Sequence, residues 1–136
     1  MLPQSGYVVM SHLPWESILP AYCDSGYEIR PLRTFAALAE ESERLGGCIT
    51  SVERTVTLCE AGIAYVFSIL DGFTGERVAM ASITLGDHVM PWKLQWVRGP
   101  GKQTVLPRII GVANGIAALY TQNDKAQGTL WTLPLL

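Results

Sequence analysis

The central part of the chain has hydrophobic residues at helical spacing. Between residues 34 and 46 one predicted helix face consists of Phe35, Leu38, Ser42 and Leu45. Thr34 is placed to act as its N-cap and Gly46 as its C-cap. The charged residues of this stretch fall mostly on the other sides, namely Glu40, Glu41, Glu43 and Arg44. The pattern therefore predicts an amphipathic helix.

A second helix is predicted directly after the first. It would begin at Gly47 or Cys48 and end at Gly62. Its apolar face would consist of Ile49, Val52, Val56 and Cys59.

Beyond residue 62 the pattern becomes typical of strands. Ile63–Leu70 is a nearly continuous apolar run, Asp71–Glu76 is rich in turn residues, and Arg77–Leu85 returns as a second strand. A third strand is predicted at Trp92–Arg98, because apolar and polar residues alternate there. In that strand Trp92, Leu94 and Trp96 would share the packed face, and Lys93, Gln95 and Val97 the wetter one.

The N-terminal part, residues 1–30, is punctuated by prolines and predicted to be irregular. A short helix could follow Pro14 at Trp15–Ala21, because proline is tolerated in a first helical turn. Tyr27–Leu32 is predicted as a short extended segment.

The C-terminal part is predicted to hold a last helix from Thr104 to Gln122. Its Gly111 and Gly115 lie one turn apart, which indicates close packing against the sheet or another helix. The tail, Gly128–Leu136, would add an edge strand.

These elements predict one α+β domain over residues 1–136, with helices packed on a small antiparallel β-sheet of three to four strands and a C-terminal helix. Residues 34–62 are its helical part, residues 63–98 its antiparallel strands and residues 104–122 its last helix.

The composition adds an expectation about partners. Hydrophobic residues make up 49% of the chain and charged residues 16%, so we expect a protein partner or a second copy, in a homodimer, to cover some apolar surface. The longest apolar run is too short to cross a membrane, and the N-terminus lacks the features of a secretory signal, which together favour a cytoplasmic protein. The three cysteines and two histidines have no metal-site spacing, so we assign no metal and no cofactor.

The charge is distributed unevenly along the chain. Residues 1–60 contain eight acidic and four basic residues, whereas residues 88–123 contain four basic residues and no acidic one. The candidate binding residues therefore lie in this second part: Lys93, Gln95, Trp96, Arg98, Lys102 and Arg108.

Two residues are candidates for catalysis. Cys48 would stand at a helix start, where the helix dipole and unpaired backbone N–H groups favour a thiolate. It could act as a nucleophile if His88 reached it as a base. The alternative interpretation is a small buried thiol at a helix junction, and for His88 a solvated loop residue.

The segment Trp92–Lys102 also permits nucleic-acid binding, because its rings could stack on bases while its cations neutralise phosphates. Against this, core packing would also place Trp92 and Trp96 on one face of the strand. The pI of about 5.6 also shows no excess of basic residues, which nucleic-acid-binding domains usually have. Common nucleotide, hydrolase and protease motifs are absent from the sequence.

Three stretches carry a family resemblance: EESERLGGCITSV at Glu40–Val52, IAYVFSILDGFTGERVAMASI at Ile63–Ile83 and LQWVRGPGK at Leu94–Lys102. They resemble the conserved part of PcfJ-like domains, a family found in conjugative plasmids, phages and related elements. The matching residues are Cys48, Ser51, Gln95, Arg98 and Gly99.

The chain also departs from the family pattern. Gly47 stands where the family has a histidine, Val52 stands where it has a tyrosine, and the asparagine that often follows the strand motif is not evident. The resemblance implies a mobile-element context and supplies no settled reaction.

On these grounds we expect a non-catalytic interaction domain of a mobile element. It would dock on a protein or nucleoprotein complex, as a relaxosome accessory or as a phage-encoded inhibitor of a host defence system. The alternatives are a thiol-dependent enzyme that uses Cys48 and a domain that binds single-stranded nucleic acid through Trp92–Lys102.

Overall fold

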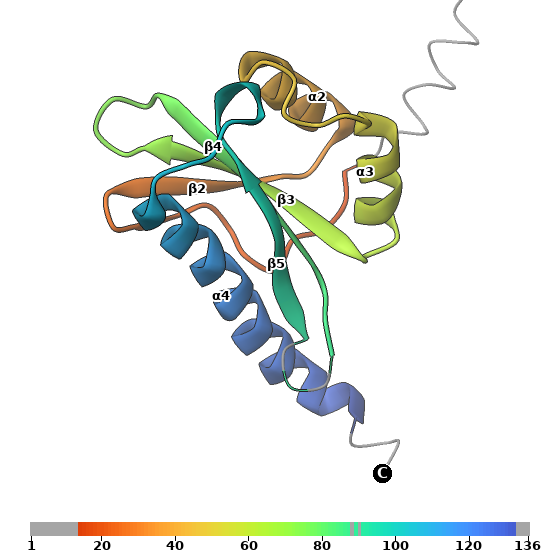
Figure 1. Ribbon diagram of the computed structural model, residues 1–136. Helices are drawn as coiled ribbons and strands as arrows, with labels where there is room; N and C mark the ends of the chain where they lie inside the picture. The colour runs from red at the N-terminus through yellow and green to blue at the C-terminus, as the bar shows by residue number, and fades with distance from the viewer. Residues whose placement is uncertain (1–13, 88, 90, 133–136) are drawn as a thin grey trace, which may run out of the picture.

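The computed structural model describes residues 14–87, 89 and 91–132 of the chain. Its centre is a five-stranded sheet in which every neighbouring pair of strands is antiparallel (Figure 1). The strands follow one another in chain order: β1 (Tyr22–Asp24), β2 (Tyr27–Leu32), β3 (Ala64–Asp71), β4 (Arg77–Leu85) and β5 (Trp92–Arg98). The predicted α+β class with an antiparallel sheet is confirmed, with five strands instead of three to four.

The helices divide between the two faces of this sheet. They are α2 (Phe35–Arg44), α3 (Val52–Glu60), the short 3-10 helix η1 (Pro100–Lys102) and α4 (Pro107–Thr132). Adjacent strand residues point to opposite faces, and along β3 Val66 packs with α2 and α3 while Phe67 packs with α4. Two hydrophobic clusters therefore form, one on each face.

The α4 face holds the larger cluster. Its aromatic centre consists of Tyr65, Phe67, Trp92 and Tyr120, with ring centroids 4.9 to 6.2 Å apart. Thr121 of α4 also accepts a hydrogen bond from the backbone N–H of Trp92 and donates one to its carbonyl, both at 3.2 Å. These contacts fix the middle of α4 against β5.

The junction between α2 and α3 differs from the prediction. The N-cap Thr34 is confirmed, since its hydroxyl accepts from the backbone N–H of Ala37 at 3.0 Å. After α2, however, Gly46 and Gly47 both have positive φ, at 76° and 81°, and this conformation keeps the chain out of a helix. The predicted helix start at Gly47 or Cys48 is therefore wrong, and α3 begins only after its N-cap Ser51.

Glu41 is buried, although it belongs to the charged part of the predicted amphipathic helix. It is only 6% exposed. Its carboxylate accepts from Arg77 Nε at 2.8 Å and from the hydroxyl of Ser68. Because Ser68 and Arg77 belong to β3 and β4, this polar cluster ties α2 to the middle of the sheet.

The N-terminal part contains no helix at Trp15–Ala21, contrary to the prediction. Trp15 instead donates its N–H to the carbonyl of Arg33 at 3.0 Å and accepts from Arg33 Nε at 2.9 Å, which holds this segment beside the end of β2. The expected extended segment at Tyr27–Leu32 is confirmed as β2, and the unpredicted β1 pairs with it through a two-residue turn with positive φ. Residues 22–30 are thus not irregular.

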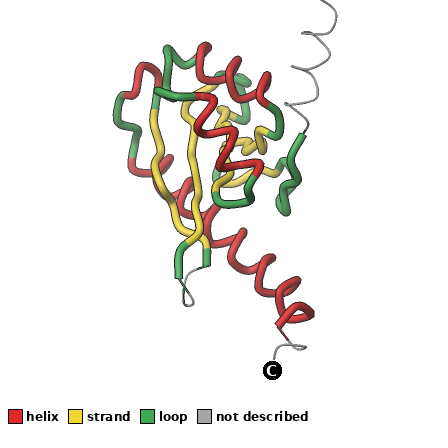
Figure 2. The backbone as a smooth tube through the Cα atoms, turned by 90° about the vertical axis from the view of Figure 1, so that its right-hand side faces the viewer, coloured by secondary structure: helices red, strands yellow, loops and turns green. Residues whose placement is uncertain are grey.

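The C-terminal helix is longer than predicted, and its far end extends past the strands (Figure 2). An edge strand was expected at Gly128–Leu136, but residues 128–132 belong to the helix, so this part of the prediction is wrong. Residues 133–136 lie outside the described residues. The prediction of close packing at Gly111 is also wrong, because a Cβ added there would meet no atom within 4 Å. At Gly115 a Cβ would lie 3.5 Å from Asp24 Oδ2 of β1.

No helix in the described part of the chain is long and apolar enough to cross a membrane. Nor do the described residues contain a group of His, Cys, Asp or Glu side chains that could hold a metal ion.

Candidate binding cleft

A one-residue bulge in β5 determines which side chains reach the candidate site. In the β4–β5 pair Ser82 stands opposite Trp96 and Ile83 stands opposite Leu94, so Gln95 is an extra residue on β5. An extra residue shifts the alternation by one position. Trp96 therefore packs against the α2/α3 cluster, whereas Trp92, Leu94 and Val97 pack on the α4 side. The predicted common face for Trp92, Leu94 and Trp96 is wrong for this reason.

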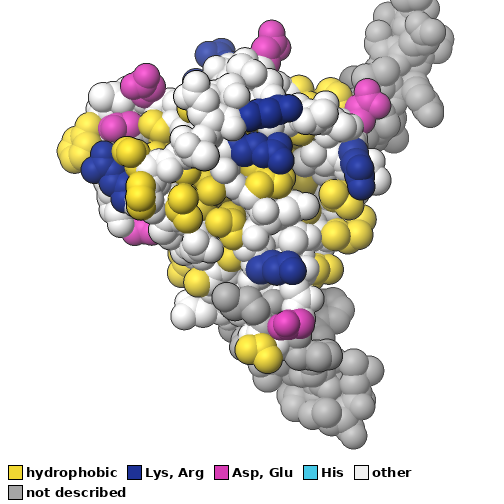
Figure 3. Space-filling model, viewed as in Figure 1, with side chains coloured by type: hydrophobic (Ala, Val, Ile, Leu, Met, Phe, Trp, Pro, Cys, Tyr) yellow, Lys and Arg dark blue, Asp and Glu magenta, His cyan; other side chains and the backbone are white. Residues whose placement is uncertain are grey.

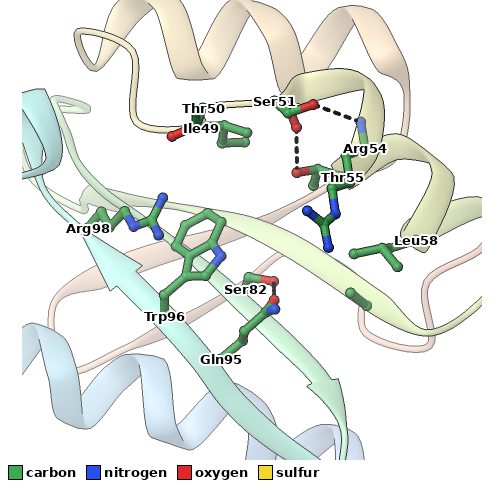
Figure 4. Close-up of a pocket in the computed structure, with 11 residues that line it drawn as sticks. Ile49, Thr50, Ser51, Arg54, Thr55, Leu58, Ser82, Gln95, Trp96 and Arg98 are labelled. Atoms are coloured by element: carbon green, nitrogen blue, oxygen red, sulfur yellow. Dashed lines mark hydrogen bonds between the residues drawn. The ribbon is translucent and has the colours of Figure 1, made fainter.

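Trp96 lies in an open cleft of about 350 Å³ between α3 and the β4–β5 pair (Figure 4). We call it the Trp96 cleft. Its lining residues are Ile49, Thr50, Ser51, Arg54, Thr55, Leu58, Ala64, Ser82, Gln95, Trp96 and Arg98. They include two arginines and no acidic residue.

The two arginines come from opposite walls of the Trp96 cleft. Arg98, from β5, stacks on the indole of Trp96 with its guanidinium carbon 4.6 Å from the ring centroid. The same guanidinium donates from Nη1 to the carbonyl of Cys48 at 2.9 Å, which fixes its plane. Arg54, from the first turn of α3, is exposed, and in Figure 4 the indole of Trp96 stands between the two arginine side chains.

Polar groups complete the walls. Ser82 donates from its hydroxyl to Gln95 Oε1 at 2.8 Å on the sheet side. On the helix side Ser51 caps α3 by accepting from the backbone N–H of Arg54 at 3.2 Å. At the rim Lys102 Nζ donates to the hydroxyl of Thr50 at 2.9 Å. The cleft thus combines cations, hydroxyls and an amide around one aromatic ring.

The cations of the Trp96 cleft have no carboxylate partner among the residues that the structure describes. The ion pairs found among the described residues all lie outside the cleft: Glu28–Arg30, Glu16–Arg33, Glu40–Arg44 and Glu41–Arg77. On the face drawn in Figure 3, Lys and Arg side chains gather over β5, the loop that follows it and α3, while acidic side chains lie at the margins. This surface is therefore a cationic one on a protein of net charge −2.

Cys48 lies behind the Trp96 cleft, in the loop between α2 and α3. Its side chain is fully buried, and Sγ donates to the carbonyl of Gly99 at 3.0 Å. Burial raises the pKa of the Cys48 thiol, although a backbone hydrogen bond and the charges of Arg98 and Lys102 act in the opposite direction. The helix-start geometry expected to favour a thiolate is absent at this position, because α3 begins four residues later. His88, the expected base, lies outside the described residues.

The structure brings together only part of the predicted binding set. Gln95, Trp96 and Arg98 line the Trp96 cleft, and Lys102 lies at its rim. Lys93 is exposed near the start of β5. Arg108 belongs to α4 on the other face, with its guanidinium carbon 6.0 Å from the ring centroid of Tyr27.

Sequence reasoning missed the helix wall of the cleft, above all Arg54. A signal was present, because Arg54 has no acidic residue three or four positions away, whereas Arg44 has Glu40 at the position that allows an ion pair. Arg54 therefore has no acidic partner for an ion pair within its own helix. Ser82 gave no comparable signal, since a serine in a strand pattern does not indicate which face it occupies.

The first and last of the stretches that carry the family resemblance meet at this site. Besides the Cys48–Gly99 contact, the backbone N–H of Gly101 donates to the carbonyl of Leu45 at 2.6 Å. A Cβ at Gly46 would lie 3.2 Å from the nitrogen of Gly101, so the two loops approach closely there. Comparisons with protein-family models, curated proteins and solved structures found no match to this chain.

Proposed function

We propose that this protein is a non-catalytic interaction domain that docks on a protein or nucleoprotein complex of a mobile element or its host. The Trp96 cleft is the docking surface. The observation that carries this proposal is the bulge at Gln95, which turns Trp96 away from the core beneath α4 and places it between two arginines without carboxylate partners among the described residues. Arginine and tryptophan are among the residue types enriched at the energetically dominant positions of protein interfaces.

The cleft is also held in a fixed shape before any partner arrives. The guanidinium of Arg98 is clamped between the indole of Trp96 and the carbonyl of Cys48. The thiol of Cys48 in turn donates a hydrogen bond to the carbonyl of Gly99, the residue after Arg98. A preformed site loses less conformational entropy on binding, and this favours a role in recognition.

The thiol-enzyme alternative has less support. A nucleophilic cysteine needs an accessible sulfur with a lowered pKa, and Cys48 is fully buried with a raised pKa. Within this arrangement Cys48 serves to hold the Gly99 loop against the α2–α3 junction.

Binding of single-stranded nucleic acid is also less well supported. That function requires several exposed rings along one groove. Trp92 is only 4% exposed, and its indole N–H donates to Asp124 at 2.9 Å in the α4 cluster. Trp96 remains as one ring, and Arg98 covers one of its faces.

Site-specific photo-crosslinking tests the proposal. A benzophenone amino acid in place of Thr50, at the rim of the Trp96 cleft, should give a discrete protein adduct in cells that carry the gene naturally. The adduct should disappear when Arg98→Glu is added, because reversing this charge removes the complementarity of the surface. Mass spectrometry of the adduct identifies the partner.

Two matched controls make the result specific. The same amino acid at Thr57, an exposed position of α3 that does not line the cleft, should not give that adduct. Arg44→Glu reverses a charge of the same type elsewhere and should leave the adduct unchanged. An adduct that forms equally from both positions, or that survives Arg98→Glu, would reject the Trp96 cleft as the docking surface.

A further inference from the structure

We infer that the Trp96 cleft recognises a carboxylate-bearing peptide segment, in which an Asp or Glu side chain of the partner enters beside the indole of Trp96 and pairs with Arg98 or Arg54. This inference rests on the proposed function and names the chemistry that the docking surface takes. The partner is thereby expected to present an acidic, extended stretch of chain to the face that carries α3 and β5.

The first argument is the number of donors that the two arginines leave open. Each guanidinium has five N–H groups, and the hydrogen bond found for Arg98 uses Nη1 toward Cys48. Stacking on Trp96 covers one face of the Arg98 guanidinium, and no other hydrogen bond uses its N–H groups among the described residues. The edge of a guanidinium matches a carboxylate geometrically, so a pair of parallel hydrogen bonds can form there.

The second argument is charge. Arg54, Arg98 and Lys102 gather at the cleft and its rim, and none of them has a carboxylate within ion-pair distance among the described residues. Of the five other arginines, four form ion pairs with glutamates of the same chain, namely Arg30, Arg33, Arg44 and Arg77, whereas Arg108 lies near the ring of Tyr27 on the other face. The unpaired cations are complementary to an anion supplied from outside.

The third argument separates a short acidic peptide from a nucleic acid. On the face drawn in Figure 3 acidic side chains lie at the margins of the cationic surface, so a long polyanion that leaves the cleft would meet them. A peptide with one or two carboxylates avoids this repulsion. Thr50, Ser51 and Gln95 provide hydroxyl and amide groups at the walls, which suit the polar groups of a peptide backbone.

The size of the cleft sets the length of the segment that it can hold. A volume of about 350 Å³ lies at the low end of the range for ligand pockets. It accommodates one or two side chains, with the flanking backbone passing over the rim. The indole of Trp96 offers its uncovered part to the aliphatic portion of the entering Glu or Asp side chain.

Fluorescence anisotropy with defined probes tests the inference. The probes are a labelled Gly/Ser peptide with a pair of glutamates, the same peptide with glutamines, and an oligothymidylate of equal net charge. The glutamate peptide should bind about tenfold more tightly than the glutamine peptide, and its affinity should fall as salt is added. Arg54→Ala and Arg98→Ala should each weaken binding roughly fivefold.

The variants have internal controls. Arg54 is exposed and has no structural bond through its side chain among the described residues, so its removal should leave the thermal unfolding midpoint unchanged. Arg44→Ala removes a guanidinium from the exposed pair with Glu40 and should leave binding of the glutamate peptide unchanged. Equal binding of the two peptides, or an equal effect of Arg44→Ala and Arg54→Ala, would overturn the inference.

The outcomes also separate this inference from the proposed function. If the glutamate peptide does not bind but the crosslink from Thr50 still depends on Arg98, the docking surface stands and the carboxylate chemistry is wrong. If the oligothymidylate binds more tightly than the glutamate peptide, the Trp96 cleft is a nucleic-acid site instead. If both the peptide and the crosslink fail, the proposed function falls as well.

Discussion

The thiol of Cys48 donates a hydrogen bond to the backbone carbonyl of Gly99, with 3.0 Å between sulfur and oxygen. This bond joins the loop between α2 and α3 to the end of β5, which lies 51 residues further along the chain. The neighbouring Arg98 donates to the carbonyl of Cys48 in the opposite direction. The two bonds together make Cys48 a structural link behind the Trp96 cleft.

The first prediction concerns the reactivity of the three thiols. Cys23 is exposed, whereas Cys48 and Cys59 are buried. In the folded protein iodoacetamide should therefore alkylate Cys23 at least about a hundredfold faster than the other two, which react only when the structure opens. Mass spectrometry of peptides after timed alkylation measures the three rates.

The same experiment bears on the thiol-enzyme alternative. The Cys23→Ser variant removes the fast signal and serves as the control. Alkylation of Cys48 in that variant at the rate seen for Cys23 would show an accessible thiolate, and the catalytic interpretation would then replace the structural one.

The second prediction concerns the buried carboxylate of Glu41. Arg77→Ala removes its charged partner and leaves the buried carboxylate with the hydrogen bond from Ser68 but no counter-charge, which should lower the free energy of unfolding by about 2 kcal/mol. Arg44→Ala breaks the exposed pair with Glu40 and should cost less than about 0.5 kcal/mol. Urea unfolding of the variants measures both values.

A second substitution distinguishes charge from packing. Glu41→Gln added to Arg77→Ala should recover part of the lost stability, since a neutral amide needs no counter-charge and can still accept from Ser68. Losses of equal size for Arg77→Ala and Arg44→Ala would show that Glu41 is not buried in solution.

Much of the fold follows from local sequence patterns. The predicted bounds of β4 and β5 agree with the structure, because apolar runs and turn residues determine a hairpin locally. The start of α3 did not follow from the apolar pattern, because the chain reverses at Gly46 and Gly47 before the helix begins. The three-residue β1 is too short for any periodicity to appear. Long and periodic elements were predictable, whereas the connections depended on individual backbone conformations.

The candidate site was predictable only in part. Gln95, Trp96, Arg98 and Lys102 stood out because they combine charge, amide and ring in one segment. The face that each side chain occupies was not predictable, since the bulge at Gln95 depends on the pairing with β4. The lack of an acidic residue three or four positions from Arg54 was a signal in the sequence, but tertiary packing alone determines that Arg54 meets Trp96 and Arg98. Alternation along a strand therefore indicates burial only where the partner strand keeps its register.

The third prediction tests the bulge directly through the two tryptophans of β5. Trp92→Phe leaves a cavity in the α4 cluster and removes the indole partner of Asp124, so it should lower the free energy of unfolding by about 2 kcal/mol. Trp96→Phe affects a half-buried ring at the cleft and should cost less than about 1 kcal/mol. The glutamate peptide should respond in the reverse order, with weaker binding for the Trp96 variant only. Equal costs for the two substitutions would indicate that both rings share one face.

The fourth prediction concerns stability at high pH. Burial raises the pKa of Cys59 from its ordinary value of 9.0 to about 12, and that of Tyr120 from 10.0 to about 12. The folded state thus holds these protons more tightly than the unfolded state does. Their contribution to stability is complete below pH 9 and is lost as the pH rises from about 9 to about 12.

Urea unfolding over this pH range should separate the two groups. The free energy of unfolding should begin to fall near pH 9 because of Cys59 and near pH 10 because of Tyr120. Each group should lower it by about 1 kcal/mol for each pH unit. Cys59→Ala should reduce the part that begins near pH 9, to which Cys48 also contributes through its raised pKa. Tyr120→Phe should reduce the part that begins near pH 10, to which Tyr22 and Tyr65 also contribute through their raised pKa values. Cys23→Ala, which removes an exposed thiol, should leave the pH dependence unchanged. A Cys59→Ala variant with the same pH dependence as the unmodified protein would mean that the Cys59 thiol reaches solvent, and the packing of α3 against β3 would then have to be looser than the structure indicates.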